Sequence, residues 1–287
     1  MRLFGTTEVV PFHKAIYATT STLLSATRMT TAIEFRDVSF ATSQGRTLLD
    51  GISFKVEKAT TTAVLGRSGS GKTTLLRSVN RLLEPTGGSV LLDGKDVRDA
   101  NLISLRRGIG YAIQENGLFP HFTVERNVGL VLEAEGRPRE ERIRRSHELL
   151  EAVGLSPANF AQRYPHQLSG GQRQRVGLAR ALAAQPGVLL MDEPFGALDP
   201  LTRSEMQNML RVLLDRLKIA VLLVTHDLDE ALYLADRIVL LEDGKIVADM
   251  EPEEFLGSRQ TEVAAYVRAF HRGERNVARD QIAERPR

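Results

Sequence analysis

Two kinds of hydrophobic spacing alternate along this chain of 287 residues. Segments 33–40 and 51–56 alternate apolar and polar positions, as half-buried antiparallel strands do. Elsewhere, short apolar runs with the length of buried parallel strands are followed by stretches of helical spacing. We expect these strands at 61–65, 188–192 and 219–225, and the helices at 73–83, 203–217 and 229–234. Strands that alternate with helices predict an α/β fold with a mainly parallel sheet.

Turn signals and a long helical stretch complete this layout. Asp93-Gly94 and Asp243-Gly244 are strong hairpin signals, and the first belongs to an antiparallel β subdomain. The hairpins pair 90–92 with 95–97 and 237–242 with 245–249, and a further short strand is expected at 109–113. From residue 122 to about residue 164 the spacing is helical. We therefore interpret about 115–170 as an α-helical subdomain inserted into the α/β domain.

Three regions follow from these patterns. Residues 1–28 are rich in Thr and Ser and lack a sustained apolar stretch, so we expect a disordered leader or an over-called gene start. The main domain is expected over 29–250, with a natural start at Met29. Residues 251–287 would form a C-terminal extension, and its charged tail from His271 onward is expected to fray.

Composition excludes several classes of protein. The 38 basic and 36 acidic residues nearly balance, so charge gives no support for nucleic-acid binding. Cysteine is absent, which excludes disulfides and thiolate metal sites, and the six histidines form no zinc-type pair. No segment approaches the ~20 consecutive apolar residues that cross a bilayer. If the chain drives transport, separate subunits must supply the membrane path.

A glycine-rich loop between strand 61–65 and helix 73–83 predicts a phosphate site. The loop fits G-x-x-x-x-G-K-[ST] in full, and its expected ATP-binding residues are Gly66, Arg67, Ser68, Gly69, Ser70, Gly71, Lys72, Thr73 and Thr74. Glycines let consecutive N–H groups point at phosphate oxygens, and the helix adds its positive N-terminal end. Lys72 would reach the β- and γ-phosphates, and Thr73 would ligate Mg²⁺.

Two carboxylates end the apolar strand 188–192. Taken alone, Asp192 and Glu193 would be the solvated acidic tip of a core strand. After a phosphate loop, however, Asp192 suits a role at Mg²⁺ that acts through the ion's other ligands or through water. Glu193 would then orient and polarise the attacking water as a general base. ATP and Mg²⁺ are therefore the expected substrate and metal.

A second glycine-containing turn precedes a helix expected at 172–184. Ser169, Gly170 and Gly171 at a helix start expose free N–H groups and form an anion-binding surface. A plain N-cap turn is the alternative interpretation. One chain cannot easily place two such sites on opposite sides of one nucleotide. The simplest arrangement is a head-to-tail dimer in which each copy completes the other's site.

The order of these motifs, with Leu-Ser-Gly-Gly-Gln at 168–172 in the middle, resembles the ATP-binding-cassette (ABC) ATPases over about 33–250. The resemblance implies a RecA-like P-loop NTPase fold and a homodimer. It implies that Gln114 contacts Mg²⁺ or water, and that His226 contacts the γ-phosphate and holds Glu193. Residues implied to reach the partner's ATP are Ser169, Gly170, Gly171, Gln172 and Asp199. ABC ATPases stack adenine on an aromatic residue before the phosphate loop, and Phe40 is the candidate here, although the usual position is polar.

Segments 116–121, 164–167 and 193–200 resemble osmoprotectant importer ATPases, those for glycine betaine, choline or other quaternary amines. This implies transmembrane permease subunits, indirectly a solute-binding protein, no nucleic acid, and a peripheral position on the cytoplasmic face of the inner membrane. Two alternatives stay open, an importer ATPase for another solute, such as an amino acid, nitrate or a sulfonate, and a soluble ABC ATPase acting on ribosomes or DNA. A third, a non-hydrolysing interaction protein, conflicts with an intact Lys72, Asp192, Glu193 and His226.

Overall fold

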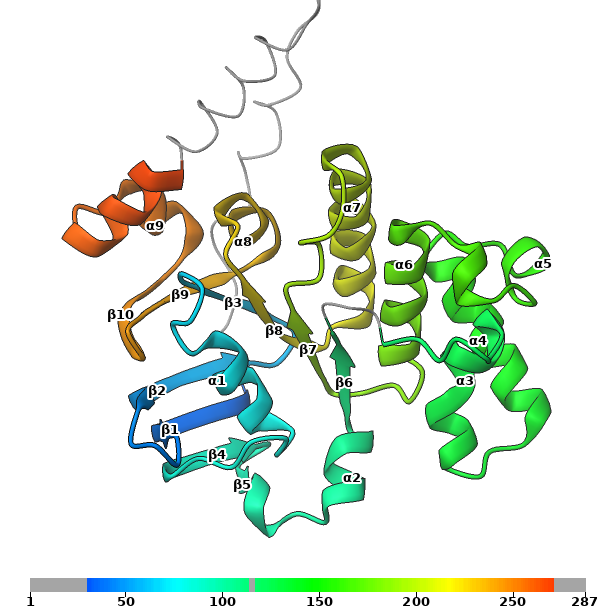
Figure 1. Ribbon diagram of the computed structural model, residues 1–287, viewed down its shortest axis with the longest axis horizontal. Helices are drawn as coiled ribbons and strands as arrows, with labels where there is room; N and C mark the ends of the chain where they lie inside the picture. Colours follow the sequence, from blue (N-terminus) through cyan, green and yellow to red (C-terminus); the bar gives the residue numbers. More distant parts are fainter. Residues whose placement is uncertain (1–29, 114–116, 271–287) are drawn as a thin grey trace, which may run out of the picture.

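The computed structural model describes residues 30–113 and 117–270. The expectations for residues 1–28, for Gln114 and for the tail from His271 onward lie outside these ranges. Within them the chain forms an α/β fold with two sheets and a block of helices at one side (Figure 1). The predicted fold class is confirmed.

The antiparallel sheet has the order β2-β1-β4-β5 among the described residues. Its strands are β1 (Thr31–Ala41), β2 (Thr47–Glu57), β4 (Gly87–Leu92) and β5 (Lys95–Asp96). The predicted alternation of buried and exposed positions is present along β2 and less regular along β1, where bulges shift the pairing with β2. The Asp93-Gly94 turn joins β4 to β5 as predicted, and β5 ends at Asp96 because that residue caps a 3₁₀ turn, Val97–Asp99.

The second sheet has the order β10-β9-β3-β8-β7-β6 in the part of the chain that the structure describes. Its strands are β3 (Thr61–Leu65), β6 (Ile109–Ala112), β7 (Val188–Asp192), β8 (Ala220–Thr225), β9 (Arg237–Glu242) and β10 (Lys245–Met250). Strands β9 to β6 run parallel, and β10 pairs antiparallel at the edge. Every residue of β3, β7 and β8 is buried, as the apolar runs predicted.

Helices cover both faces of the parallel sheet (Figure 1). The described helices are α1 (Lys72–Val79), α2 (Leu102–Arg107), α3 (Val124–Ala134), α4 (Arg139–Ala152), α5 (Pro157–Phe160), α6 (Gly170–Ala181), α7 (Pro200–Leu217), α8 (Leu228–Leu234) and α9 (Pro252–Gly257), followed by a helical segment at 261–270. Helices α3, α4 and α5 pack on one another, and α3 and α4 pack on α6. They form the helical block that the sequence predicts.

Two hydrophobic clusters share the central strands. Val64 and Leu190 belong to the cluster that contains α1 and the antiparallel sheet. Leu65 and Leu189, their neighbours along the chain, belong to the cluster beneath α6, α7 and α8. Successive side chains of a strand point to opposite faces, so each central strand holds both cores together. Because both faces of these strands are covered by apolar cores, the polar residues of a binding site lie where the strands end.

Helices α1 and α6 differ in their bounds from the prediction, α7 begins three residues earlier, at Pro200, and α2 was missed. Helix α1 ends at Val79 instead of residue 83, because Arg81 has a left-handed backbone (φ 51°) and its guanidinium binds three carbonyl groups of the segment 97–100. Helix α6 spans Gly170–Ala181 instead of 172–184. Helix α2 is too short for hydrophobic periodicity to reveal, and it begins where the side chain of Asn101 caps two backbone N–H groups.

The chain beyond residue 250 continues the same fold. Phe255 in α9 and Val263 in the helical segment 261–270 are fully buried in the larger hydrophobic cluster. Tyr266 and Val267 are partly buried and pack against that cluster. This part of the predicted C-terminal extension is therefore packed against the domain.

Candidate nucleotide-binding site

The topology brings three loops to one edge of the parallel sheet. Strands β3, β8 and β7 are neighbours and parallel, so the loops after Leu65, Thr225 and Asp192 leave the sheet side by side. In open parallel sheets, ligands bind outside the carboxyl ends of the strands. The phosphate loop, the loop that carries His226 and the acidic strand end therefore share one site.

The phosphate loop ends at Gly71, the N-cap of α1. Gly71 has a left-handed backbone (φ 102°) and offers no side-chain cap, so nothing from the N-cap side chain occupies the first N–H groups of α1. A Cβ atom at this position would lie 2.6 Å from the carbonyl oxygen of Leu48. Glycine is thus required both by conformation and by space. The uncapped N-terminus of α1 is suited to bind an anion.

Lys72 folds back over the loop. Its Nζ donates to the carbonyl oxygens of Gly66 at 2.8 Å and Arg67 at 2.9 Å. The side chain is buried, and burial lowers its pKa, while Glu193 and Asp192 act in the opposite direction. A buried ammonium beside the uncapped N-terminus of α1 makes the loop suited to bind phosphate.

Thr73 and Asp192 form a pair suited to Mg²⁺. The Thr73 hydroxyl donates to Oδ1 of Asp192 at 3.0 Å. Burial raises the pKa of Asp192, and the Thr73 hydrogen bond and Arg77 partly offset this. In the described residues no cluster of three or more acidic, His or Cys side chains could hold a metal. The pair still fits Mg²⁺, because this ion commonly takes one or two protein ligands together with nucleotide phosphates and water.

Glu193 lies next to His226 across the end of β8. Nδ1 of His226 is 3.3 Å from Oε2 of Glu193. The Glu193 backbone is left-handed (φ 45°), and its N–H donates to the carbonyl of Val224 at 2.9 Å. This conformation is uncommon for a residue other than glycine, and such residues concentrate at functional sites. The structure thus brings the two predicted catalytic side chains together beside the phosphate loop.

A cavity of about 260 Å³ opens at the phosphate loop. Its lining from the predicted site comprises Ser68, Gly69, Gly71, Lys72, Thr73, Thr74 and Glu193. The β1–β2 turn adds Arg46, and the start of β2 adds Leu48. Phe40 is absent from this lining, and its partly buried ring packs against the cluster that contains α1. Phe40 as the adenine contact stays a prediction, and the structure offers Arg46 at the cavity instead.

The turn before α6 is capped by its own residues. The hydroxyl of Ser169 accepts the N–H of Gln172 at 3.3 Å, and Oε1 of Gln172 accepts the N–H of Ser169 at 2.9 Å. This reciprocal capping box corresponds to the N-cap turn that the sequence analysis gave as the alternative interpretation. Ser169 and Gly170 are exposed, while Gly171 is buried with Thr202 against it. Asp199 caps α7 by accepting the N–H of Thr202 at 3.0 Å.

The residues expected to act on a partner's nucleotide stay apart from the phosphate loop of their own chain. Neither 169–172 nor Asp199 contributes to the lining of the 260 Å³ cavity. Within the described ranges, the cavity walls come from the β1–β2 turn, the start of β2, the phosphate loop and the end of β7. The structure leaves the turn at Ser169 on the surface, where only another molecule could use it.

Comparisons with known proteins agree with this geometry. The family described as ABC transporter matches residues 49–196, a range that contains the phosphate loop, the turn at Ser169 and the acidic strand end. The chain belongs to the ABC transporter family. The resemblance that the motif order suggested is thereby confirmed.

Relatives of this cassette include the choline transport ATP-binding protein OpuBA of Bacillus subtilis and the glycine betaine uptake system ATP-binding protein YehX of Escherichia coli. Each is 44% identical, over 224 and 220 residues respectively. The matches cover 78% and 77% of this chain and 58% and 71% of those proteins. The cassette thus spans little more than half the length of relatives such as OpuBA.

Solved structures show the same fold. The dimeric post-hydrolysis state of the ATP-binding cassette MJ0796, bound to ADP and Pi, has a TM-score of 0.69 and 33% identity, and covers 77% of this chain and 98% of its own. CbiO1 from Clostridium perfringens has a TM-score of 0.74 and 27% identity, and covers 85% and 99%. Of the helices in the described ranges, none is long and apolar enough to span a membrane.

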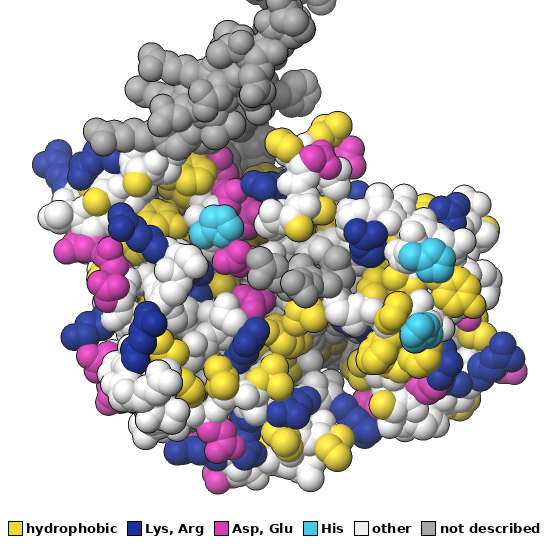
Figure 2. All heavy atoms as spheres, viewed as in Figure 1, with side chains coloured by type: hydrophobic (Ala, Val, Ile, Leu, Met, Phe, Trp, Pro, Cys, Tyr) yellow, Lys and Arg dark blue, Asp and Glu magenta, His cyan; other side chains and the backbone are white. Residues whose placement is uncertain are grey.

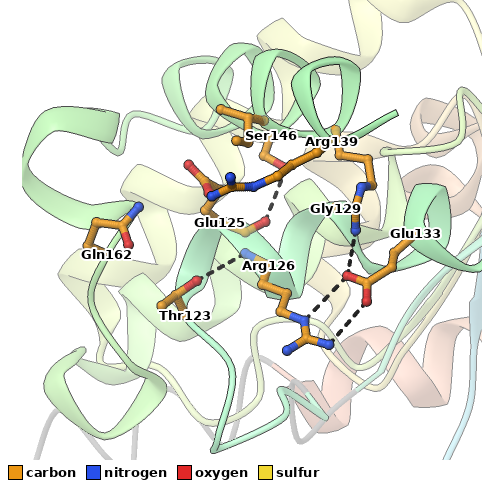
Figure 3. Close-up of a pocket in the computed structure, with 10 residues that line it drawn as sticks. Thr123, Glu125, Arg126, Gly129, Glu133, Arg139, Ser146 and Gln162 are labelled. Atoms are coloured by element: carbon orange, nitrogen blue, oxygen red, sulfur yellow. Dashed lines mark hydrogen bonds and ion pairs between the residues drawn. The ribbon is translucent and has the colours of Figure 1, made fainter. Parts of the chain in front are cut away.

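A larger cavity, of about 340 Å³, lies in the helical block of the cassette between α3 and α4 (Figure 3). Its charged side chains point toward one another. Glu133 accepts from Arg126 at 3.1 Å and from Arg142 at 2.7 Å, and Glu125 lies 2.7 Å from His147. None of the residues that line this cavity also lines the cavity at the phosphate loop, so the two are separate.

Two residues near the site escaped the sequence interpretation. Glu230 in α8 is buried and accepts the hydroxyl of Thr225 at 2.6 Å, and burial raises its pKa to about 7. Tyr266 donates its hydroxyl to the carbonyl oxygen of His226 at 2.9 Å. The spacing of Asp227 and Glu230, a cap followed three residues later by Glu, could have indicated the first. No local pattern links Tyr266 to a loop 40 residues earlier.

Proposed function

We propose that this cassette is the ATP-hydrolysing subunit of an importer that takes up a small solute, of the quaternary amine class, through separate permease subunits. The observation that carries ATP hydrolysis is the contact between His226 and Glu193 at 3.3 Å beside the phosphate loop. The similarity to OpuBA, a choline transport protein, and to YehX, a glycine betaine uptake protein, supports the solute class.

Some residues of the site would bind the phosphates and the metal ion, and others would activate the attacking water. The N–H groups of the phosphate loop and the ammonium of Lys72 bind the β- and γ-phosphates. Thr73 and Asp192 would hold Mg²⁺, with Gln114 as a further contact, and the ion would neutralise phosphate charge. Glu193 orients the attacking water and accepts its proton, and His226 keeps Glu193 in place.

The functional unit that we propose is a head-to-tail homodimer. Its support is the surface position of Ser169, Gly170 and Gln172, whose turn is absent from the walls of the chain's own phosphate cavity. The dimeric MJ0796 cassette, bound to ADP and Pi, is similar over 98% of its length. In such a dimer Ser169 and the N–H groups that follow it would face the γ-phosphate bound by the partner copy.

The helical block offers the surface for the permease. Hydrophobic side chains gather over this block in Figure 2, and Phe119 and Tyr164 are 48% and 40% exposed. The rings of Phe119 and Phe122 stack, as do those of Tyr164 and His166. Exposed apolar patches rimmed by polar residues mark interaction sites. Docking there would hold the cassette peripherally at the cytoplasmic face of a membrane, with a solute-binding protein acting on the permease from the other side.

Glu193→Gln tests hydrolysis and dimerisation together. The amide keeps the shape of the side chain but cannot accept the proton, so ATP hydrolysis should fall at least about a hundredfold while ATP binding persists. With Mg-ATP the variant should elute as a dimer on gel filtration and without nucleotide as a monomer. Glu253→Gln, a matched change on the exposed face of α9, should behave as the wild type. A Glu193→Gln protein that stays monomeric with ATP contradicts the proposed dimer.

A second experiment addresses the solute. The cassette would be co-purified with its membrane permease and reconstituted in vesicles, and hydrolysis would be measured with binding protein loaded with glycine betaine, choline, an amino acid or nitrate. Stimulation by the quaternary amines alone supports the proposal. Co-purification with ribosomes or nucleic acid in place of a permease would overturn it.

A further inference from the structure

The helical segment 261–270, in the C-terminal part of the chain, lies beside the phosphate loop, because its Tyr266 lines one cavity with Gly66 and Arg67. Its Val263 is fully buried in the larger cluster, and Val267 packs against the same cluster. This packing anchors the segment to the domain. The segment therefore has a defined place from which a side chain can act on the site.

That side chain is Tyr266. Its hydroxyl donates to the backbone carbonyl oxygen of His226 at 2.9 Å. The tyrosine also lines a cavity of about 210 Å³ together with Gly66 and Arg67, the first residues of the phosphate loop. The phenol thus lies between the loop that binds phosphate and the loop that carries His226.

The hydroxyl of Tyr266 stays protonated, as a donor must. Burial raises the pKa of Tyr266 to about 12, and Asp227 adds to the rise, while the backbone of Gly66 and the side chain of Arg67 lower it. A phenol with such a pKa is neutral throughout the range in which enzymes work. The hydrogen bond to His226 is therefore always available.

The loop 225–227 is braced on both sides of His226. Thr225 donates its hydroxyl to buried Glu230 at 2.6 Å, and Asp227 lies 3.0 Å from Arg203. His226 itself has a side chain that is 59% exposed, so close packing does not orient its imidazole. Its direction depends on the backbone at residue 226 and on the contact with Glu193.

We propose that Tyr266 is a positioning residue for ATP hydrolysis, which holds the backbone carbonyl of His226 so that the imidazole stays against Glu193. The inference rests on the proposed ATPase function and deepens it. The segment 261–270 then acts on the reaction through the His226 loop, without contacting the phosphates. The apolar contacts of Val263 and Val267 anchor the segment and do not involve the Tyr266 hydroxyl. The hydroxyl can therefore be removed without disrupting this packing.

Tyr266→Phe removes the hydroxyl and keeps the ring. We expect kcat for ATP hydrolysis to fall about tenfold, the loss typical of one hydrogen bond that orients a catalytic group. The Kd for ATP and the melting temperature should stay close to the wild-type values, because the phosphate loop and the core are intact. The matched control is Tyr233→Phe, which removes a hydroxyl that donates to Asn208 at the surface. It should leave kcat unchanged.

The double variant with His226→Ala tells positioning from a general effect on the fold. If Tyr266 acts through His226, the change to Phe has no further effect on kcat once the imidazole is gone. Independent, multiplying losses would overturn the inference, as would an unchanged kcat in Tyr266→Phe alone. A tenfold loss accompanied by an equally weakened ATP affinity or a lower melting temperature would also overturn it, since the hydroxyl would then be structural.

The imidazole resonances of His226 give a readout that needs no turnover. In Tyr266→Phe they should shift, and in Tyr233→Phe they should not. A wild type that binds but does not hydrolyse ATP would refute the proposed function, while this spectrum would still test the contact. Unchanged His226 resonances in Tyr266→Phe count against the positioning role whatever the activity.

Discussion

The N-termini of α1 and α6 both follow glycine-containing turns, yet their backbone N–H groups have different partners. At α1 the N-cap is Gly71, which has no side chain to offer. At α6 the N-cap is Ser169, and its hydroxyl and the side chain of Gln172 satisfy two of the N–H groups within the chain. A helix end that is left uncapped has unmet donors and is suited to bind a ligand, whereas a capped one is stable by itself.

The surroundings of the two helix ends differ as well. The N-terminus of α1 has a buried lysine and two carboxylates around it, all supplied by the same chain. The N-terminus of α6 has exposed Ser169 and Gly170, and no charged group of the phosphate cavity lies there. The first end is a nearly complete site, whereas the second is an exposed turn that could contact a nucleotide only on another chain. The comparison therefore favours two chains sharing each nucleotide.

Lys72→Ala is expected to have the largest effect, because it removes the cation inside the α1 site. Hydrolysis should fall at least about a hundredfold, the loss typical when a preorganised group that stabilises transferring phosphate is deleted. Phosphate release under saturating Mg-ATP measures it. Lys55→Ala, an exposed lysine of β2, serves as the control and should keep full activity. Comparable activity in both variants would mean that Lys72 at the N-terminus of α1 is not needed for hydrolysis.

Gly71→Ala and Gly170→Ala compare the two turns directly. At position 71 the new Cβ meets the carbonyl oxygen of Leu48 at 2.6 Å in a left-handed backbone, so the free energy of unfolding should fall by about 2 kcal/mol. At position 170 a Cβ meets nothing within 4 Å, so stability should be unchanged. Urea denaturation measures both. Equal losses would mean that the turns are under the same constraint.

Ser169→Ala should lower stability less than Gly71→Ala does. Loss of the cap lowers the free energy of unfolding by about 1 kcal/mol. Hydrolysis should fall about tenfold, while ATP binding to the separate chain stays normal, because Ser169 is remote from its own phosphate cavity. Nucleotide titration and phosphate release separate the two effects. Weaker ATP binding by the monomer would place Ser169 in the chain's own site.

Mixing the Ser169→Ala and Lys72→Ala proteins sharpens this result. A head-to-tail heterodimer of the two contains one site with an intact lysine and an intact partner serine, together with one site that lacks both. The mixture should therefore be more active than either variant alone. If both residues served the nucleotide of their own chain, mixing would restore nothing.

Much of the fold could be predicted because its strongest signals are local. Segments 61–65 and 188–192 are strands with those bounds, since a fully buried parallel strand is mostly apolar. The end of α1 could not be predicted, because it depends on Arg81 binding carbonyl groups of 97–100, a contact between separate elements. Phe40 shows the same limit, since its ring packs on the core cluster although the sequence offered it as the aromatic nearest the phosphate loop.

The residues of the candidate site likewise include some that the sequence could predict and some that it could not. Glycines, Lys72 and Thr73 are contiguous, so their chemistry can be read from order alone. Glu193 and His226 are separated by 33 residues (226 minus 193), and they could be paired only through the resemblance to ABC ATPases. Tyr266 and Arg46 had no local signal, and only packing reveals that they lie at the site.

By itself the sequence specifies the α/β class and the phosphate loop, because each depends on residues close together in the chain, and it specifies the family through the order of its motifs. Folding decided which distant groups touch. The order of β3, β8 and β7 sets His226 beside Glu193 and the phosphate loop. The packing of 261–270 sets Tyr266 against the carbonyl of His226. Such contacts arise when strands and helices pack on a shared core, and hydrophobic periodicity records which face is buried but not what it meets.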